Sequence, residues 1–309
     1  MAVYLAKCPL GFFVFDEQGR FLGYSKDEKI KKRFKDIIED NTFLRKGLRN
    51  AIIKAGLAKS DLEINIMLNE AGILSVKQKL RQGRKENIAK PVVGMIEQID
   101  KNLNSFVERF REWYGLHFPE LTKVVTDNER FVQLVAEGGS RDKIKGFENL
   151  ASTSAGMEFS PQDVETARAW AGMLAQIFEQ RKALFKYLEK ICKETMPNLY
   201  GIAGAFIAAK LLEHAGSLEK LAKMPASTIQ LLGAEKALFR HLKEKAKVPK
   251  YGIIFLHPFV QHAKPENRGK VARLLAAKLS LAARIDYFSK EDRSAELKKD
   301  LEEEIKKLS

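Results

Sequence analysis

One row of basic side chains near the carboxyl end of the sequence has the spacing of a binding surface. On a helix of roughly 100° per residue, three cations and a small alanine fall within a sector about 60° wide. They are Lys270, Arg273, Ala277 and Arg284. Because the alanine leaves room between the cations, a sugar–phosphate backbone can approach closely and release its counterions. The apolar residues of the adjoining sector, which we expect to be buried, are Val271, Leu274, Leu275, Leu279, Leu281 and Ala282. Lys278 lies in that sector, where it either snorkels to an edge, which is the more common outcome, or reaches a polar partner.

A second basic row precedes the first. Lys236, Arg240 and Lys243 are spaced i, i+4, i+7, so a helix places them on one face. Just before them, Gly233-Ala234 leaves backbone N–H groups near a helix start, where phosphate binds well. A single basic row is usually solvated surface, but two rows on neighbouring helices favour contact with RNA. No base-reading helix or aromatic stacking surface stands out, so these residues alone hardly separate RNA from DNA.

The residues that usually carry catalysis or bind metals form no recognisable site. None of the five histidines has the i, i+4 spacing of a helical metal pair, and we interpret His257 as structural. The sequence has no Walker-type phosphate loop, GxSxG elbow or HExxH pair. Gly201-Ile202-Ala203-Gly204 opens a helix, but no strand of the kind a dinucleotide site needs precedes it. We therefore predict a protein that binds rather than catalyses, with no metal and no cofactor of its own.

The net charge of +14 is unevenly distributed. Residues 1–85 hold 18 Lys and Arg against 10 Asp and Glu, and residues 201–289 hold 15 against 6. The segment between these blocks is slightly acidic. A polyanion is the natural partner of basic blocks. For the N-terminal block, a solvated surface rich in Lys and Glu, as in thermophilic proteins, explains the charge equally well.

The cysteines and apolar stretches bear on the compartment. Cys8 and Cys192 lie far apart without CxxC spacing, which is typical of a reduced, cytoplasmic protein. The longest apolar stretches, such as Tyr251 to Val260, are too short to span a bilayer. The amino-terminal residues lack the pattern of a secretory signal. We expect a cytoplasmic protein.

The first block, residues 1–85, predicts a small α+β domain. Its predicted strands, with a hairpin around Gln18-Gly19, are Val3–Ala6, Gly11–Phe15 and Arg20–Tyr24. Its predicted helices are Asp27–Ile38 and Thr42–Gly56, the second capped by its glycine. The apolar alternation from Leu62 to Leu68 indicates a further, half-buried strand.

Two apolar seams with alternating spacings of four and three residues dominate the middle block, residues 86–200. The first seam is Val92, Ile96, Ile99, Leu103, Phe106, Phe110 and Trp113. The second is Trp170, Leu174, Ile177, Arg181, Leu184, Leu188 and Ile191, with Arg181 its one polar member. A polar stretch from Glu137 to Ser160 suits a connection, so the seams predict an antiparallel coiled-coil hairpin. Two helices of an ordinary bundle are the alternative. Met173, Phe178 and Phe185 lie off the seam and indicate a second buried face, which we expect to pack on another copy of the chain.

The third block, residues 201–289, predicts an all-α domain. The expected helices are Leu199–His214, Ala234–Lys245 and Gly269–Tyr287. Tyr251 to Leu256 is expected to be a short buried strand or helix. Residues 290–309 form a charged tail, which we expect to be a solvated or frayed helix.

Two stretches of the third block resemble the signatures of the Nop domain. They are Met224–Arg240, MPASTIQLLGAEKALFR, and Asn267–Lys278 followed by Leu281–Asp286. A weaker similarity covers Trp113–Leu121. The three-part layout resembles the archaeal Nop-family core proteins of box C/D small ribonucleoproteins from near residue 1 to about residue 289. The long basic tail of eukaryotic relatives is absent, which favours an archaeal member.

The resemblance implies a mainly α, multidomain scaffold without catalytic activity, which serves RNA-guided ribose 2′-O-methylation in rRNA processing. It implies that residues 1–85 bind fibrillarin, the methyltransferase that carries S-adenosylmethionine. It implies that the coiled coil of residues 86–200 forms a homodimer. The Nop domain, residues 201–289, would bind box C/D guide RNA together with the small kink-turn-binding protein.

The resemblance also implies which residues lie at or near RNA. With Arg284 added from the basic row, they are Gly233, Ala234, Glu235, Lys236, Arg240, Asn267, Arg268, Lys270, Arg273 and Arg284. A carboxylate beside phosphate repels it, so we expect Glu235 to accept hydrogen bonds from a base, a ribose or a neighbouring cation.

Three other functions are compatible with these patterns. A spliceosomal-type Nop protein also binds a kink-turn complex but carries no methyltransferase, and failure to bind fibrillarin would favour it. An RNA-modifying enzyme would act by itself, and methyl transfer by the isolated protein would favour it. A purely structural coiled-coil adaptor would bind RNA equally badly with and without the kink-turn protein.

Overall fold

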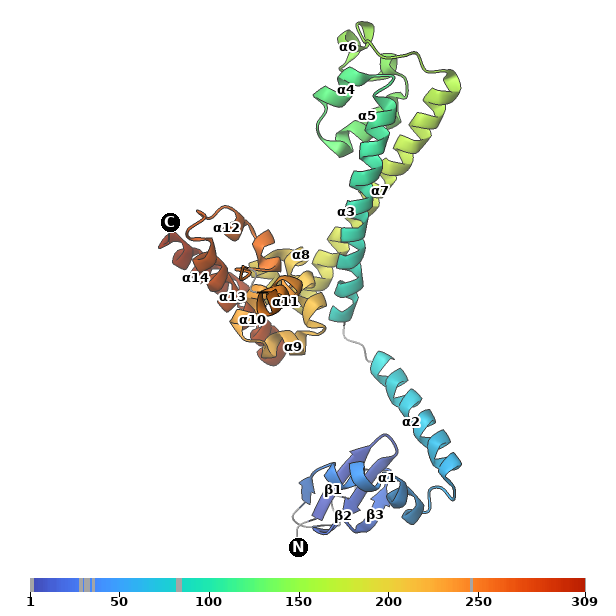
Figure 1. Ribbon diagram of the computed structural model, residues 1–309, viewed down its shortest axis with the longest axis vertical. Coiled ribbons are helices and arrows are strands. Elements are labelled where there is room, and N and C mark those ends of the chain that lie inside the picture. Colours follow the sequence, from blue (N-terminus) through green and yellow to red (C-terminus); the bar gives the residue numbers. More distant parts are fainter. Residues whose placement is uncertain are drawn as a thin grey trace. The chain divides into compact units, whose positions relative to one another are not determined.

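The computed structural model describes residues 3–27, 30, 34, 37–81, 85–244 and 247–308, without the side chains of residues 45, 46 and 79–81. The chain divides into two compact units, residues 1–83 and 84–309. The first contains a small sheet and the second is built of helices (Figure 1), which confirms the predicted mainly α class with a small α+β domain.

The first unit is a four-stranded sheet with two helices after it. Its strands are β1 (Val3–Cys8), β2 (Gly11–Phe15), β3 (Phe21–Ser25) and β4 (Ile37–Glu39), in the order β3-β2-β1-β4. The first three pair antiparallel and β4 pairs parallel to β1. Alternate side chains are buried on both faces, with Phe13 and Phe15 packing in one cluster with Ile52, and Leu5 and Val14 in another. The helix α1 (Thr42–Lys54) ends before Gly56, which has a φ of +67°, as expected.

Two predictions for this unit are wrong. The alternating stretch from Leu62 to Leu68 is part of the helix α2 (Asp61–Arg81). Ser60 accepts a hydrogen bond from the Glu63 N–H, and the Glu63 carboxylate accepts one from the Lys59 N–H. This reciprocal capping starts a helix, and in it Ile64 is buried while Ile66 is exposed. The helix expected over 27–38 is contradicted at its end, where Ile37 and Ile38 lie in β4, and residues 28, 29, 31–33, 35 and 36 of it lie outside the described residues.

The second unit carries the predicted hairpin. Helices α3 (Glu86–Tyr114) and α7 (Pro161–Thr195) run side by side (Figure 1). At the start of α7, the Ser160 hydroxyl accepts a hydrogen bond from the Asp163 N–H at 3.2 Å, and the Asp163 carboxylate accepts one from the Ser160 N–H at 3.0 Å. Pro161 follows at the first helical position, where its missing N–H costs nothing.

On α3, every second residue of the observed seam lies one position after the residue that was predicted. On α3 the seam runs through Val93, Ile96, Asp100, Leu103, Val107, Phe110 and Tyr114. Of the predicted members, those that are buried are Val92, Ile96, Leu103, Phe110, Leu174, Leu188 and Ile191. Ile99, Trp113, Ile177 and Leu184 are half-buried, and Phe106 and Trp170 are exposed. Arg181, the polar member, donates two hydrogen bonds to Asp100, at 2.8 and 3.0 Å.

A helical cap covers the outer end of the hairpin. It consists of α4 (Pro119–Val124), α5 (Asn128–Gly138), η2 (Arg141–Lys143) and α6 (Glu148–Ser152). Tyr114, Phe118, Phe131 and Ile144 are fully or almost fully buried within it. The stretch expected to be a connection, residues 137–160, therefore contributes Ile144 and Ala151 to a packed core.

The remaining helices form a bundle at the inner end of the hairpin (Figure 1). They are α8 (Pro197–Ala215), α9 (Leu218–Lys223), α10 (Ala226–Leu231), α11 (Glu235–Glu244), η3 (Ile253–Leu256), α12 (Pro258–Gln261), α13 (Arg268–Arg284), the π-helical turn η4 (Ile285–Ser289) and α14 (Ser294–Lys306). One hydrophobic cluster runs from Val93 and Ile96 of α3 through α8 to α13. The Lys210 ammonium of α8 lies 2.9 Å from the Glu97 carboxylate of α3. The hairpin base and the bundle therefore share a core.

The expectation of a solvated tail is wrong. Leu297 and Leu301 of α14 are buried in the bundle core against α8 and α13. The start of α14 is tied to the start of α8, because the Asn198 side chain accepts a hydrogen bond from the Arg293 N–H at 2.7 Å. The charged composition of this segment does not reveal its apolar stripe, which consists of two leucines one helical turn apart.

Candidate nucleic-acid interface

Helix α13 presents the predicted basic face to solvent. Its opposite side is fixed in the core by Val271, Leu275 and Leu279, each at most 2% exposed. Lys270, Arg273, Ala277 and Arg284 are exposed, as the helical projection predicts. Lys270 and Arg284 are fourteen residues apart, or about 21 Å along a helix. A cationic surface several phosphates long is thus held on a rigid support.

In the apolar sector of α13, the predicted burial of Leu281 is wrong, and Lys278 takes the less common of the two outcomes expected for it. Leu281 is 43% exposed. Lys278 does not snorkel; its ammonium lies 3.1 Å from Glu304 and 3.5 Å from Asp300 of α14. Burial lowers the pKa of Lys278, but these carboxylates outweigh burial and raise the pKa above its ordinary value. The lysine therefore helps to hold α14 rather than contribute to the basic face.

The predicted RNA-contacting residues of this region fall into two groups. Lys270 and Arg273 form no ion pair or side-chain hydrogen bond with any described residue, so their charges are available to a ligand. Three others are engaged by backbone carbonyl groups. Asn267 donates to the Leu308 oxygen at 2.7 Å, Arg268 to those of Ala263 and Gln261, and Arg284 to that of Ala222 at 3.3 Å. Their role at RNA stays a prediction, but in the free protein they hold neighbouring segments together.

The second predicted basic row lies on α11. Lys236, Arg240 and Lys243 are exposed, whereas Leu238 and His241 on the other side of the helix are half-buried. No described residue of α11 is fully buried. The row is therefore presented outward, but the packing of its helix is shallow.

The backbone before α11 is not the open phosphate site that the sequence predicts. The Gly233 N–H donates to the Glu235 carboxylate at 2.7 Å, and the Ala234 N–H donates to the Leu231 oxygen at 2.8 Å. Both donors are therefore occupied within the chain. The Glu235 carboxylate accepts from this backbone and lies 3.4 Å from His214 Nδ1, and its expected hydrogen bond from a base, a ribose or a neighbouring cation stays a prediction.

One aromatic side chain, which the pattern of cations in the sequence does not include, lies within the basic row of α11. Phe239 is 58% exposed, and the Lys243 ammonium lies 4.7 Å from the centre of its ring. Aromatic rings among cations stack on unpaired bases in many RNA-binding proteins. The helical projection could have found it, because Phe239 is three residues after Lys236 and four before Lys243.

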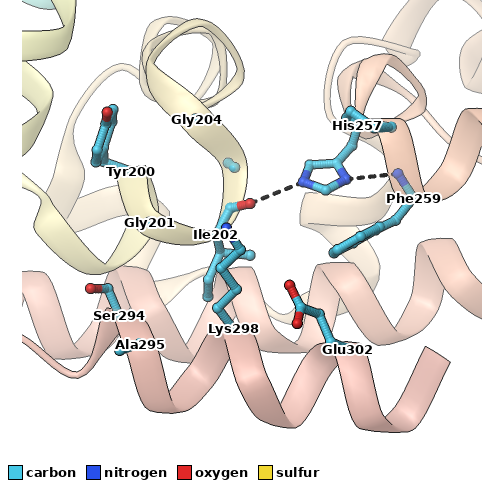
Figure 2. A pocket seen from close by; sticks show the side chains of 12 residues that line it. Tyr200, Gly201, Ile202, Gly204, His257, Phe259, Ser294, Ala295, Lys298 and Glu302 are labelled. Carbon is cyan, nitrogen blue, oxygen red and sulfur yellow. Dashed lines mark hydrogen bonds between the residues drawn. The ribbon is translucent and has the colours of Figure 1, made fainter. Parts of the chain in front are cut away.

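The pocket around His257 is a structural joint (Figure 2). It has a volume of about 700 Å³ and lies between Tyr200–Gly204 of α8, the turn at His257 and one face of α14. Helix α8 breaks there, since Gly204 has a φ of +74°. His257 Nδ1 accepts from the Phe259 N–H at 3.2 Å, so its Nε2 carries the proton and donates to the Ile202 oxygen at 2.9 Å. Burial lowers the pKa of His257, and with both ring nitrogens bonded to backbone the residue serves the structural role predicted for it.

Neither a candidate metal site nor a candidate membrane span is found among the described residues. No group of three or more His, Cys, Asp or Glu among them is arranged to hold a metal ion. None of the helices in this part of the chain has the length and apolar character required to cross a membrane.

The comparison with protein families matches most of the second unit. Residues 95–307 match the Nop family, described as "snoRNA binding domain, fibrillarin". The matched range contains both basic rows, all of α14 and the hairpin except for the first nine residues of α3.

Several curated proteins are similar to the chain. Nucleolar protein 56 of Homo sapiens is 39% identical over 231 residues, which cover 69% of this chain and 39% of that protein. An uncharacterized NOP5 family protein of Methanocaldococcus jannaschii is 43% identical over 218 residues, which cover 66% of this chain and 53% of that protein. Nucleolar protein 58 of Schizosaccharomyces pombe is 35% identical over 275 residues, which cover 83% of this chain and 54% of that protein. The chain thus spans between about two fifths and about half of the length of these relatives.

One solved structure is also similar. A chain in the crystal structure of a fibrillarin/Nop5p complex is 26% identical, with 99% of this chain and 100% of that chain covered and a TM-score of 0.47.

Proposed function

The chain belongs to the Nop family, and from this membership we propose that it is a non-catalytic scaffold of a box C/D RNA-guided ribose 2′-O-methylation complex. In this role the bundle binds guide RNA together with a small kink-turn-binding protein. The first unit, residues 1–83, binds fibrillarin, which holds S-adenosylmethionine and performs the methyl transfer. The chain itself uses no cofactor.

The basic face of α13 carries the proposal. It lies within the matched family region, is held rigidly by a buried opposite face, and offers Lys270 and Arg273 without a partner among the described residues. Cations already fixed in place lose little conformational freedom when they meet phosphate. The α11 row with Phe239 adds a second, adaptable contact.

The mechanism we propose is positioning. The guide RNA selects the target by base pairing, and the scaffold holds the methyltransferase near the selected ribose. Holding two reactants on one body replaces a slow encounter by a local one. The core shared by the hairpin and the bundle supports this role, because it fixes the distance between the hairpin and the RNA-binding face.

Self-association through the hairpin completes the proposal. A second apolar face, beside the buried seam, is exposed on α3 and α7. Its exposed members are Ile88, Met95, Phe106, Trp170 and Met173, between 37% and 53% exposed. The rings of Phe106 and Trp170 join the two helices at 6.2 Å between centroids. A second copy of the chain fits this face, because two such hairpins would bury identical apolar surfaces.

The test of RNA recognition is a titration on a kink-turn RNA at fixed salt, with and without the small kink-turn-binding protein. Binding that requires the small protein supports recognition of a composite surface. Equal binding in both series would reduce the basic rows to a general polyanion surface and overturn the proposal.

The test of the enzymatic partner is a methylation assay with guide RNA, substrate RNA and S-adenosylmethionine. We expect methyl transfer only when fibrillarin is added. Transfer by the chain alone would make it an enzyme, and failure to bind fibrillarin would favour the spliceosomal-type alternative.

The test of self-association uses two adjacent residues of α3. Phe106 is 42% exposed and Val107 is fully buried in the hairpin. We expect Phe106→Asp to convert a dimer into a monomer without loss of thermal stability, as light scattering and thermal unfolding would show. Val107→Ala should lower stability by about 1–3 kcal/mol and leave the dimer intact. A dimer that persists in Phe106→Asp would contradict this face as the interface.

A further inference from the structure

Helix α11 packs only shallowly along its length, where Leu238 and His241 are half-buried, and hydrogen bonds hold its base. The chain leaves the bundle at Gln230–Leu232 and returns at residues 250–253, and hydrogen bonds join the two segments. The Gly252 N–H donates to the Gln230 oxygen and the Ile253 N–H to the Leu232 oxygen, both at 2.8 Å. The helix between them has no fully buried residue among those described. Few contacts therefore fix the direction in which α11 projects.

Glu235 supplies one of these contacts, at the first residue of α11. Its Oε1 accepts the Gly233 N–H at 2.7 Å and lies 3.4 Å from Nδ1 of His214. His214 belongs to the last turn of α8, which is part of the bundle core. The carboxylate thus connects the start of the projecting helix to an element whose position is set by packing.

The turn that Glu235 closes has little freedom of its own. Gly233 has a φ of +88°, and a Cβ there would lie 2.5 Å from Cγ1 of Ile253. Burial raises the pKa of Glu235, but the N–H groups of Gly233 and Glu235 and the nearby His214 outweigh burial and lower it overall. The charged carboxylate is therefore the form that this turn favours.

We propose that Glu235 is a positioning residue, which together with His214 latches α11 to the bundle and so sets the direction of Lys236 and Arg240 toward RNA. Glu235 acts through these cations and not by contact with the nucleic acid. This inference rests on the proposed RNA-binding function. It also explains how a carboxylate is tolerated beside phosphate, since its lone pairs are directed toward the protein's own backbone.

The latch is first tested without RNA, by amide hydrogen exchange of the full-length chain over the 231–238 segment. Glu235→Ala should speed exchange of the Gly233 amide, His214→Ala should do so less, and Glu235→Gln should retain much of the protection because its side-chain oxygen still accepts. Glu244→Ala is the matched control, since it removes the same charge from the exposed far end of α11. Unchanged exchange in Glu235→Ala would overturn the latch, whatever the RNA affinity.

The same variants are then titrated with kink-turn RNA and the small kink-turn-binding protein. We expect Glu235→Ala to weaken binding about threefold to tenfold, His214→Ala less, and the double variant no more than Glu235→Ala. Glu235→Gln should restore most of the affinity and Glu244→Ala should not weaken binding. If Glu235 contacted RNA directly, His214→Ala would leave the affinity unchanged.

Arg273→Glu in the same series separates the two proposals. If it weakens binding while Glu235→Ala binds as tightly as the unmodified chain, the positioning role is overturned and the RNA-binding function stands. If neither variant changes the affinity, both proposals fail.

Discussion

Helices α13 and α11 both carry rows of exposed cations, but they differ in what holds them. One face of α13 is buried among apolar side chains such as Leu275, which has no exposed surface. Helix α11 has no fully buried described residue and is held chiefly by hydrogen bonds at its base, which include that of Glu235. A ligand therefore meets cations that packing fixes on α13 and cations that mainly hydrogen bonds hold in place on α11. The molecule combines a strongly fixed contact with a more weakly fixed one within a single bundle.

The largest expected effect is on the free energy of unfolding, and it tests whether packing holds α13 but not α11. Leu275→Ala should lower the free energy of unfolding by about 2–5 kcal/mol, because it removes a fully buried side chain and leaves a cavity. Leu242→Ala on α11, where the leucine is 72% exposed, should cost less than about 0.5 kcal/mol. Urea unfolding of the full chain measures both. Similar losses in the two variants would remove the contrast.

The second effect concerns RNA affinity. Arg273→Glu should weaken binding of the kink-turn complex by about tenfold or more, because it replaces a fixed attraction for phosphate by a repulsion. Lys236→Glu should weaken it less, since fewer contacts hold α11 in place than hold α13. Lys101→Glu, on the exposed surface of α3, controls for net charge. The same variants should bind fibrillarin normally, and a larger loss for Lys236→Glu than for Arg273→Glu would reverse the assignment of the more strongly and the more weakly fixed contact.

The smallest effect concerns pH and the joint that supports α13. The pKa of His257 is lowered in the folded chain, so the unfolded chain binds a proton more readily. The free energy of unfolding should therefore fall as pH drops below about 6.5, by at most about 1.4 kcal/mol per pH unit, and be unaffected by this group at higher pH.

Paired variants identify the group responsible. His257→Gln should flatten this dependence even if it lowers stability overall, because the slope reports the titration. His262→Gln, which replaces an exposed histidine five residues later, is the matched control. An equally steep slope in His257→Gln would show that another group titrates.

How well the sequence predicts an element depends on whether local or long-range interactions decide the structure of that element. The glycine stop after α1 is local and was correctly anticipated, and the predicted connecting stretch ends at Ser160, directly before α7. The strand predicted over residues 62–68 is wrong because the capping residues Ser60 and Glu63 start a helix there, although the apolar residues alternate. The burial of α14 depends on contacts with α8 and α13 from far along the chain, which its own charged composition does not reveal.

The sequence by itself determined which helix faces are basic and which are apolar, because the helical period decides that locally. Only the tertiary structure decided which of two neighbouring apolar faces closes the hairpin, since that choice depends on the partner helix. It placed Val93 and Val107 inside, with Asp100 opposite Arg181, and left Phe106 exposed. The structure likewise decided that the Gly233 N–H meets Glu235 rather than standing open to phosphate. A hydrogen-bond donor is taken by whichever acceptor the folded chain brings within reach, and composition and spacing do not specify that acceptor.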